Sequence, residues 1–386
     1  MGNEIVIEYI NTSAALDKCV SELEQAPELA FDLEFDKNNY AYGFNLCLIQ
    51  IATRDRCYII DPMAQLKLEP LFRILEKPEV LKVVHSPGED LRLLHSLRCY
   101  PKNLFDTQVV IRLLNHEKIS LGDALENVLG ITADKKLQRS NWMKRPLTDE
   151  QIKYAANDVL HLLPMHDALQ QQAEAKGIVN FIEEELKFLE TTIHEDGDKE
   201  NFLKESELTS MSDYHQYVLN GLLKVRDTAA QRINKPPSWV APNDKIRDVV
   251  YGKEQLSSFL DWPGLHPAVR TPKFKSELIK TYSELTEAAK DLSKKSKTVF
   301  LTAAQRHEKA QQKEESEKLR EVIFKPIQQE LERLYGEHAA KYILGDGVVG
   351  RLLRKEMQLR EIKENYRREV IMKTAAALNI DISAYL

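Results

Sequence analysis

The stretch Ala30-Phe31-Asp32-Leu33-Glu34-Phe35 alternates apolar and acidic side chains near the start of the chain. This alternation predicts a β-strand, in which side chains two positions apart point to the same face of a sheet. Asp32 and Glu34 therefore share one face. Two carboxylates held side by side between apolar neighbours repel each other unless a positive charge lies near them, although a solvent-facing strand would also carry such a pair.

Short apolar runs around this stretch predict the rest of a sheet. The runs 45–51 and 56–60 follow it closely, and the second ends at the turn pair Asp61-Pro62. These three runs predict an antiparallel meander. Residues 81–85 predict a fourth strand, which Ser86-Pro87-Gly88 ends.

Helical periodicity dominates from residue 89 to about residue 190. The predicted helices are 89–97, 107–115, 121–129, 148–171 and 179–191. Strands followed by helices predict an α/β or α+β domain with a mixed sheet. Asp106 is expected to cap the helix that begins at Thr107.

Three further residues carry chemistry in two of these helices. Asp90 lies in the first turn of a predicted helix, where an acid also favours the helix dipole, so neighbouring Glu89 is an equally plausible capping residue. Tyr154 and Asp158 are four positions apart and share a helix face, an arrangement that is also common on helix surfaces. Carboxylates brought together from distant segments favour Mg²⁺ or Mn²⁺. Two such ions about 4 Å apart promote the in-line cleavage of phosphodiesters.

Length and composition describe a soluble globular protein. The 386 residues predict two or three domains, with 43% hydrophobic and 30% charged residues. No apolar run approaches the roughly 20 residues of a membrane helix, and the first residues lack the pattern of a signal peptide. We therefore expect a cytoplasmic protein. The four cysteines form no C-x-x-C pair, which argues against zinc and a disulfide framework, and Cys47 is expected in the core.

Charge is distributed unevenly along the chain. The net charge of −6 combines −12 on residues 1–200 with +3 on 201–295 and +3 on 296–386. The acidic part holds the predicted metal site, and the later parts would suit a polyanion, although +3 over about 90 residues is also unremarkable.

The second half of the chain is predicted to be helical. Residues 191–213 are polar and acidic and are expected to form a linker. Residues 214–295 form a helical domain that Asn234-Lys235-Pro236-Pro237 interrupts. Residues 303–333, rich in Lys, Glu and Gln, predict a long solvated helix, and helices resume from Val348 after Gly345-Asp346-Gly347.

Taken together, residues 5–190 resemble the ribonuclease D family of the DEDD superfamily of 3′-5′ exonucleases, in the branch with a tyrosine in the third motif. The motifs are Asp32-Leu33-Glu34 with the run 47–51, His85 with Asp90, and Tyr154 with Asp158. The segment 135–148, from Lys135 through Trp142 to Thr148, also resembles the lead into the third motif. The resemblance implies an α/β, ribonuclease-H-like nuclease domain with a mixed five-stranded sheet, followed by all-α C-terminal domains.

A second resemblance covers about 210–295. The segment 222–230 followed by Asn234-Lys235-Pro236-Pro237 resembles an HRDC domain, a helical nucleic-acid-binding module. The expected domains are the exonuclease at 1–190, the linker at 191–213, the HRDC-like domain at 214–295, and a helical domain at 296–386 that resembles a degenerate second HRDC domain.

The resemblance implies a reaction that uses two divalent metal ions, Mg²⁺ or Mn²⁺. Asp32, Glu34 and Asp158 would hold one ion, and Asp32 with Asp90 would hold the second. Tyr154 would orient the attacking water. Nucleoside 5′-monophosphates would leave the 3′ end of RNA one at a time, and the family implies trimming of tRNA precursors or other small structured RNAs.

Substrate contacts are expected from residues near these motifs. Tyr40, Tyr42 and Trp142 could stack on terminal bases, and Arg145, in a basic cluster with Lys135, Lys136, Arg139 and Lys144, could bind phosphates. Packing is an equal alternative for Trp142, and a solvated face is an alternative for the cluster. His85 is either a site residue or a hydrogen-bonded structural residue.

Two other functions compete with the exoribonuclease hypothesis. A DNA 3′-5′ exonuclease of the same superfamily would use the same metal chemistry, and a non-catalytic RNA-binding adaptor would keep the fold. All four acidic motif positions and Tyr154 are present, which argues against the adaptor. The chain contains no D-x-D-x-D-G loop, the spacing typical of a calcium site. No membrane partner is expected, and the sequence leaves protein partners open.

Overall fold

The computed structural model describes residues 5–132, 137–194, 201–297 and 303–386. The chain forms two compact units. The first contains Met1–Glu34, Leu46–Glu195 and Ala303–Leu386, and the second contains Phe35–Asn45 and Asp196–Thr302. Among the described residues, no helix combines the length and the apolar character that spanning a membrane requires.

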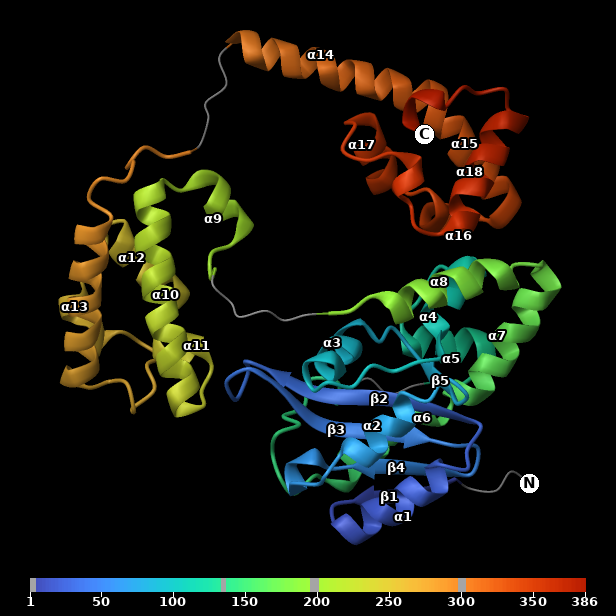
Figure 1. Ribbon diagram of the computed structural model, residues 1–386, viewed down its shortest axis with the longest axis horizontal. Helices are drawn as coiled ribbons and strands as arrows, with labels where there is room; N and C mark the ends of the chain where they lie inside the picture. Colours follow the sequence, from blue (N-terminus) through green and yellow to red (C-terminus); the bar gives the residue numbers. More distant parts are fainter. Residues whose placement is uncertain (1–4, 133–136, 195–200, 298–302) are drawn as a thin grey trace. The chain divides into compact units, whose positions relative to one another are not determined.

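Six strands form one mixed sheet in the order β1-β4-β3-β2-β5-β6 (Figure 1). The strands are β1 Val6–Ile10, β2 Glu28–Lys37, β3 Phe44–Ala52, β4 Arg56–Ile60, β5 Leu81–Val84 and β6 Leu104–Asp106. β3 and β4 are antiparallel, as the meander predicts. β1 joins β4, β5 joins β2 and β6 joins β5 in parallel. The α/β class and the mixed sheet are confirmed.

The implied number of five strands is wrong, because the sheet has six. The run patterns give four strands and miss the two edges. β6 has only three residues, too few to show a period. β1 pairs on one side only, with β4, so much of its stability comes from a partner about 50 residues away in sequence.

Most predicted helices of the first unit are present. They are α3 Gly88–Ser96, α4 Thr107–Leu113, α5 Leu121–Leu129 and α8 Val179–Thr191, whereas α1 Ser13–Leu23 and α2 Glu69–Leu75 were not predicted. Asp106 caps α4 by accepting the Gln108 N–H, as expected.

The predicted helix 148–171 is divided in two. α6 Asp149–Leu160 ends at His161, and α7 Leu162–Lys176 begins directly afterwards. Pro164 explains the break, because it has no N–H for the carbonyl of Leu160 and its ring crowds that carbonyl. The break sets the direction of α6, the helix that carries Tyr154 and Asp158.

The C-terminal helices of the first unit pack against the part of that unit that contains the sheet. They are α14 Ala303–Leu319, a π-helical turn at Arg320–Phe324, α15 Lys325–Tyr335, α16 Glu337–Ile343, α17 Asp346–Leu353 and α18 Asn365–Ala377. One buried cluster contains Val110 of α4 and Ile182 of α8 together with Leu331 and Ile371 of these helices. The expectation of a solvated helix over 303–333 therefore holds for exposed α14 but is wrong for α15, which buries Ile327 and Leu331.

The second unit is a helical bundle with its own core. Its helices are α9 Glu205–Ser210, α10 Asp213–Ile233, α11 Pro237–Val240, α12 Asn243–Val250 and α13 Pro272–Ala288. The core includes Leu219, Val249 and Phe274. α10 ends where Asn234 takes a left-handed conformation, which a proline pair follows.

Candidate active site

Strand β2 and the turns before α3 and α6 position the acidic residues. Asp32 and Glu34 alternate with the buried side chains of Phe31 and Leu33, so both carboxylates point to one face of the sheet. Asp90 lies in the first turn of α3, with 8% of its surface exposed.

The turn that leads into α3 depends on a residue from another strand. Asp106, at the end of β6, accepts the backbone N–H of Ser86 at 2.9 Å, and Ser86 adopts a left-handed φ of 57°. This carboxylate therefore holds the turn that places Asp90, as well as capping α4. Burial raises the pKa of Asp106 to about 6. The sequence predicts only its capping role.

The electrostatics of the acids show that the charges of four carboxylates act on one another. Burial, followed by the negative charges of Asp32, Asp158 and Asp90, raises the pKa of Glu34 to about 10. Burial and the charge of Asp32 raise the pKa of Asp158 to about 8 and hold that of Asp90 well above its ordinary value. Burial raises the pKa of Asp32 itself to about 7. Each acid is thus destabilised as an anion by its surroundings.

This donor set fits a hard divalent cation, which prefers oxygen ligands and would offset the repulsion among the carboxylates. The four carboxylates do not converge on one centre. Among the described residues, no three acidic, histidine or cysteine side chains form a group that could hold an ion.

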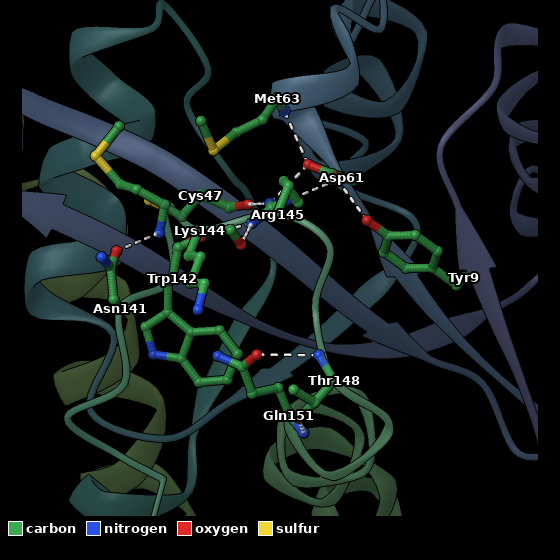
Figure 2. Close-up of polar contacts among 11 residues, drawn as sticks. Tyr9, Cys47, Asp61, Met63, Asn141, Trp142, Lys144, Arg145, Thr148 and Gln151 are labelled. Atoms are coloured by element: carbon green, nitrogen blue, oxygen red, sulfur yellow. Dashed lines mark hydrogen bonds and ion pairs between the residues drawn. The ribbon is translucent and has the colours of Figure 1, made fainter.

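Tyr154 lies one helical turn before Asp158 on α6. Its ring packs beside that of Trp142, with 6.1 Å between the ring centroids and 34° between the planes. Trp142 is 4% exposed, so packing accounts for its position. α6 begins with a capping box in which Thr148 and Gln151 exchange backbone and side-chain hydrogen bonds (Figure 2).

Arg145, three residues before Thr148, forms a clamp with Asp61 (Figure 2). Arg145 Nε and one terminal nitrogen donate to the two oxygens of Asp61 at 2.6 and 2.7 Å. Its other N–H groups donate to the carbonyls of Cys47, Trp142 and Lys144. All five guanidinium N–H groups are therefore used within the protein, which leaves none for a phosphate.

Tyr9 completes the clamp from β1. Its hydroxyl donates to Asp61 at 2.5 Å, and the Met63 N–H donates to the other oxygen at 3.0 Å. Burial acts to raise the pKa of Asp61, but the hydrogen bonds from Arg145 and Tyr9 outweigh it and keep that pKa below the ordinary value. From the sequence, Asp61-Pro62 is predicted only as a turn. The position of Asp61 directly after an apolar strand is the feature that could have indicated its role in the clamp.

His85 is hydrogen-bonded at both ring nitrogens. Nδ1 lies 2.8 Å from the Thr107 hydroxyl and Nε2 lies 3.0 Å from the Ile119 carbonyl. Burial lowers the pKa of His85 to about 4, so the ring is neutral. Nε2–H must then donate to Ile119 while Nδ1 accepts from Thr107. This arrangement corresponds to the structural alternative for His85.

The aromatic residues after β2 belong to the second unit. Tyr40 is 41% exposed, and its backbone N–H donates to Asp36. The Tyr42 hydroxyl donates to Asp227 at 2.6 Å. Within the basic cluster, Lys135 and Lys136 lie outside the described residues.

Comparison with known proteins identifies the class of this site. Residues 7–174 match a protein-family model described as a 3′-5′ exonuclease. Exonucleases of this family use divalent metal ions.

Curated proteins named ribonuclease D are similar to this chain. The "Ribonuclease D" of Shewanella sp. (strain ANA-3) is 34% identical over 186 residues, which are 47% of each chain. The chain spans between about half and two thirds of the length of the curated ribonuclease D relatives that it matches.

Two solved structures share the fold. The exoribonuclease RNase D of Escherichia coli is 22% identical with a TM-score of 0.68, covering 97% of this chain and 99% of that chain. The catalytic core of RRP6 from Trypanosoma brucei is 25% identical with a TM-score of 0.63, covering 74% and 81%. The ribonuclease-H-like nuclease fold with a helical C-terminal region is thereby confirmed.

Proposed function

We propose that the chain is a metal-dependent 3′-5′ exoribonuclease that releases nucleoside 5′-monophosphates from RNA. The observation that carries the proposal is the gathering of four carboxylates from β2, α3 and α6, each with a raised pKa, within a domain that matches the exonuclease model. Similarity to ribonuclease D proteins supports RNA as the substrate class.

The proposed site residues follow from this arrangement. Asp32, Glu34, Asp90 and Asp158 hold two divalent ions, Mg²⁺ or Mn²⁺. When bound, such ions supply a water of lowered pKa and charge stabilisation for the leaving 3′ oxygen. Tyr154 orients the attacking water, which assigns the protein to the tyrosine branch. A phenol with an ordinary pKa of about 10 is a poor base at pH 7, so orientation accounts better for its role than proton abstraction.

The remaining parts of the proposal concern substrate and context. Tyr40 could stack on a base because its side chain is exposed, whereas Tyr42, His85, Trp142 and Arg145 are engaged or buried in the protein and act indirectly. The second unit serves as an HRDC-like nucleic-acid-binding module, and the RNA is a tRNA precursor or another small structured RNA. All four cysteines are free thiols, in keeping with a reducing cytoplasm.

A labelled-substrate assay tests this proposal. A 5′-labelled RNA and the matching DNA are incubated with wild type, Asp32→Asn, Tyr154→Phe and the surface control Asp167→Asn, with Mg²⁺, Mn²⁺ or EDTA. We expect a metal-dependent ladder that shortens RNA from its 3′ end, activity at least 100-fold lower in Asp32→Asn, and no change in Asp167→Asn.

The other outcomes separate the alternatives. Faster cleavage of DNA than RNA would assign the chain to DNA exonucleases. Binding of RNA without cleavage under any condition would favour an adaptor. A Tyr154→Phe variant with full activity would contradict the role given to that hydroxyl.

A further inference from the structure

The side-chain amide of Gln50, on β3, is fully buried and makes no hydrogen bond with the residues that the structure describes. Its side chain is 0% exposed, and neither its nitrogen nor its oxygen has a hydrogen-bond partner among the residues that the structure describes. An unsatisfied buried polar group destabilises the folded protein. A leucine or methionine of similar size would avoid this destabilisation. Stability therefore does not explain the amide, which indicates a functional role.

The strand register places Gln50 on the face of the sheet that carries the acids. Gln50 lies opposite Ile59 of β4, and directly opposed residues share a face. Ile59 belongs to the same buried cluster as Ala30 of β2 and Val159 of α6. Asp32 follows Ala30 by two positions and therefore points to that face as well.

The order of the strands places Gln50 on the strand next to that of Asp32. β3 lies between β4 and β2 (Figure 1). α6, which carries Asp158, packs against β4. Gln50 thus lies between the strand of Asp32 and the strand under the helix of Asp158, with an amide that no described residue uses.

We propose that Gln50 is a positioning residue of the carboxylate centre, whose side-chain NH₂ group donates a hydrogen bond to Asp32 when the centre holds a divalent ion. A carboxylate that gives one oxygen to a metal presents its other oxygen to a donor, and such outer partners orient the ligand. The proposal rests on the proposed function, because Gln50 has nothing to position without a metal centre.

The chemistry of the amide suits this position. A lysine would pair with the carboxylates and compete with the cation, and a glutamate would add a fifth negative charge to four. A neutral donor does neither, so it orients Asp32 without changing the charge of the centre.

Replacement by an apolar residue of similar size tests the proposal. Gln50→Leu removes the unsatisfied amide, so the melting temperature without metal should stay equal or rise. Its Mn²⁺ dissociation constant should be about ten-fold higher than that of wild type, the scale seen when outer-sphere partners are lost. Full-length protein without RNA is titrated with Mn²⁺, and free Mn²⁺ is read by electron paramagnetic resonance. Gln50→Met serves as the second variant if Gln50→Leu fails to fold.

Two controls make the outcome decisive. Ile49→Leu, the neighbouring buried position on β3, should bind Mn²⁺ as wild type does, and Asp158→Asn should lose binding. Wild-type affinity in both Gln50→Leu and Gln50→Met would overturn the role of Gln50 alone. Wild-type protein that binds no Mn²⁺ would overturn the proposed metal centre, and with it the role of Gln50.

Discussion

The acidic residues in and near the site are of two kinds, those whose pKa is lowered and those whose pKa is raised. Asp61 is paired with Arg145, and its pKa lies below the ordinary value. Asp32, Glu34 and Asp158 are buried near one another with no described cation among them, and their pKa values are raised to about 7, 10 and 8. The first acid stabilises the fold as an anion, whereas the other three favour the fold only when they are protonated or bound to a cation.

The raised pKa values predict how stability depends on pH. Unfolding returns Asp32 and Asp158 from about 7 and about 8 to their ordinary value of 3.8, so the unfolded chain binds fewer protons between these limits. The stability that these acids contribute is complete below their ordinary pKa. It is lost as pH rises through their folded-state values. In EDTA, we expect the melting temperature to fall between pH 5 and pH 8.5, by more in wild type than in Asp32→Asn.

The same acids predict a metal effect of the opposite sign. Because a cation binds the deprotonated carboxylates, Mn²⁺ should raise the melting temperature more at pH 8.5 than at pH 6. Thermal denaturation of wild type and Asp32→Asn at both pH values checks this. An equal Mn²⁺ effect at both pH values, or one that persists in Asp32→Asn, would contradict a carboxylate centre.

Loss of the clamp at Arg145 should be costly. The side chains of Asp61 and Arg145 are 5% and 22% exposed, so Arg145→Ala leaves a buried carboxylate without its charged partner. We expect a loss of about 3 kcal/mol in the free energy of unfolding, measured by urea denaturation. The matched control is Arg354→Ala, whose pair with Glu356 is 58% and 51% exposed and should cost less than about 1 kcal/mol. Similar losses in both variants would show that the clamp contributes no more than a surface pair.

At the scale of elements, helix ends are fixed by single residues from distant segments. Asn115, just after α4, accepts the N–H groups of His338 and Ala339 and so caps α16 across more than 200 residues. Gly336, at the start of α16, has a φ of 91° and a ψ of 161°, a conformation essentially restricted to glycine. A short polar side chain and a glycine thus join the C-terminal helices to the nuclease part of the first unit.

Substitution of this glycine should therefore destabilise the first unit. A β-carbon at position 336 would lie 2.2 Å from the Asn115 carboxamide, so Gly336→Ala strains the backbone and displaces the cap. We expect a loss of at least about 2 kcal/mol in unfolding free energy, from strain and from the lost cap. Gly347→Ala is the control, because no atom lies within 4 Å of the added carbon and the position is helical. A Gly336→Ala protein as stable as Gly347→Ala would contradict the close contact.

At the scale of the whole molecule, the chain does not divide into units in simple sequence order. The C-terminal helices share a buried cluster with the sheet and its helices, whereas residues 196–302 form a unit with their own core. Glu185 of α8 contacts three side chains of the C-terminal helices. It accepts the hydroxyls of Tyr342 and Tyr366 at 2.9 and 2.5 Å and pairs with Arg367 at 2.6 Å.

Removal of the Glu185 charge should loosen the C-terminal helices. Glu185→Gln keeps the shape but leaves Arg367, whose side chain is 16% exposed, without an anion. We expect a loss of about 3 kcal/mol and faster amide hydrogen exchange in α8, α16 and α18. Exposed Glu183→Gln should change stability by less than about 0.5 kcal/mol. Faster exchange in α18 with no change in α8 would show that the two do not open together.

Local pattern in the sequence determines much of this protein. Alternation predicts the central strands, periodicity predicts α3, α4, α5 and α8, and the motif residues Asp32, Glu34, Asp90 and Asp158 are predicted before any coordinates. These signals are readable because side-chain direction within a strand or helix depends on residues only two to four positions apart. Pro164 was equally visible, but the break between α6 and α7 was missed because periodicity continues across it.

Only the tertiary structure decides which distant residues meet. The edge strands β1 and β6, the clamp of Tyr9, Asp61 and Arg145, the buried amide of Gln50 and the union of the C-terminal helices with the nuclease part all depend on contacts between residues far apart in sequence. No local period records such contacts, because a partner's identity follows from packing and from the burial of charge. The sequence therefore indicates which residues are candidates for the chemistry, and folding determines which residues hold them in place.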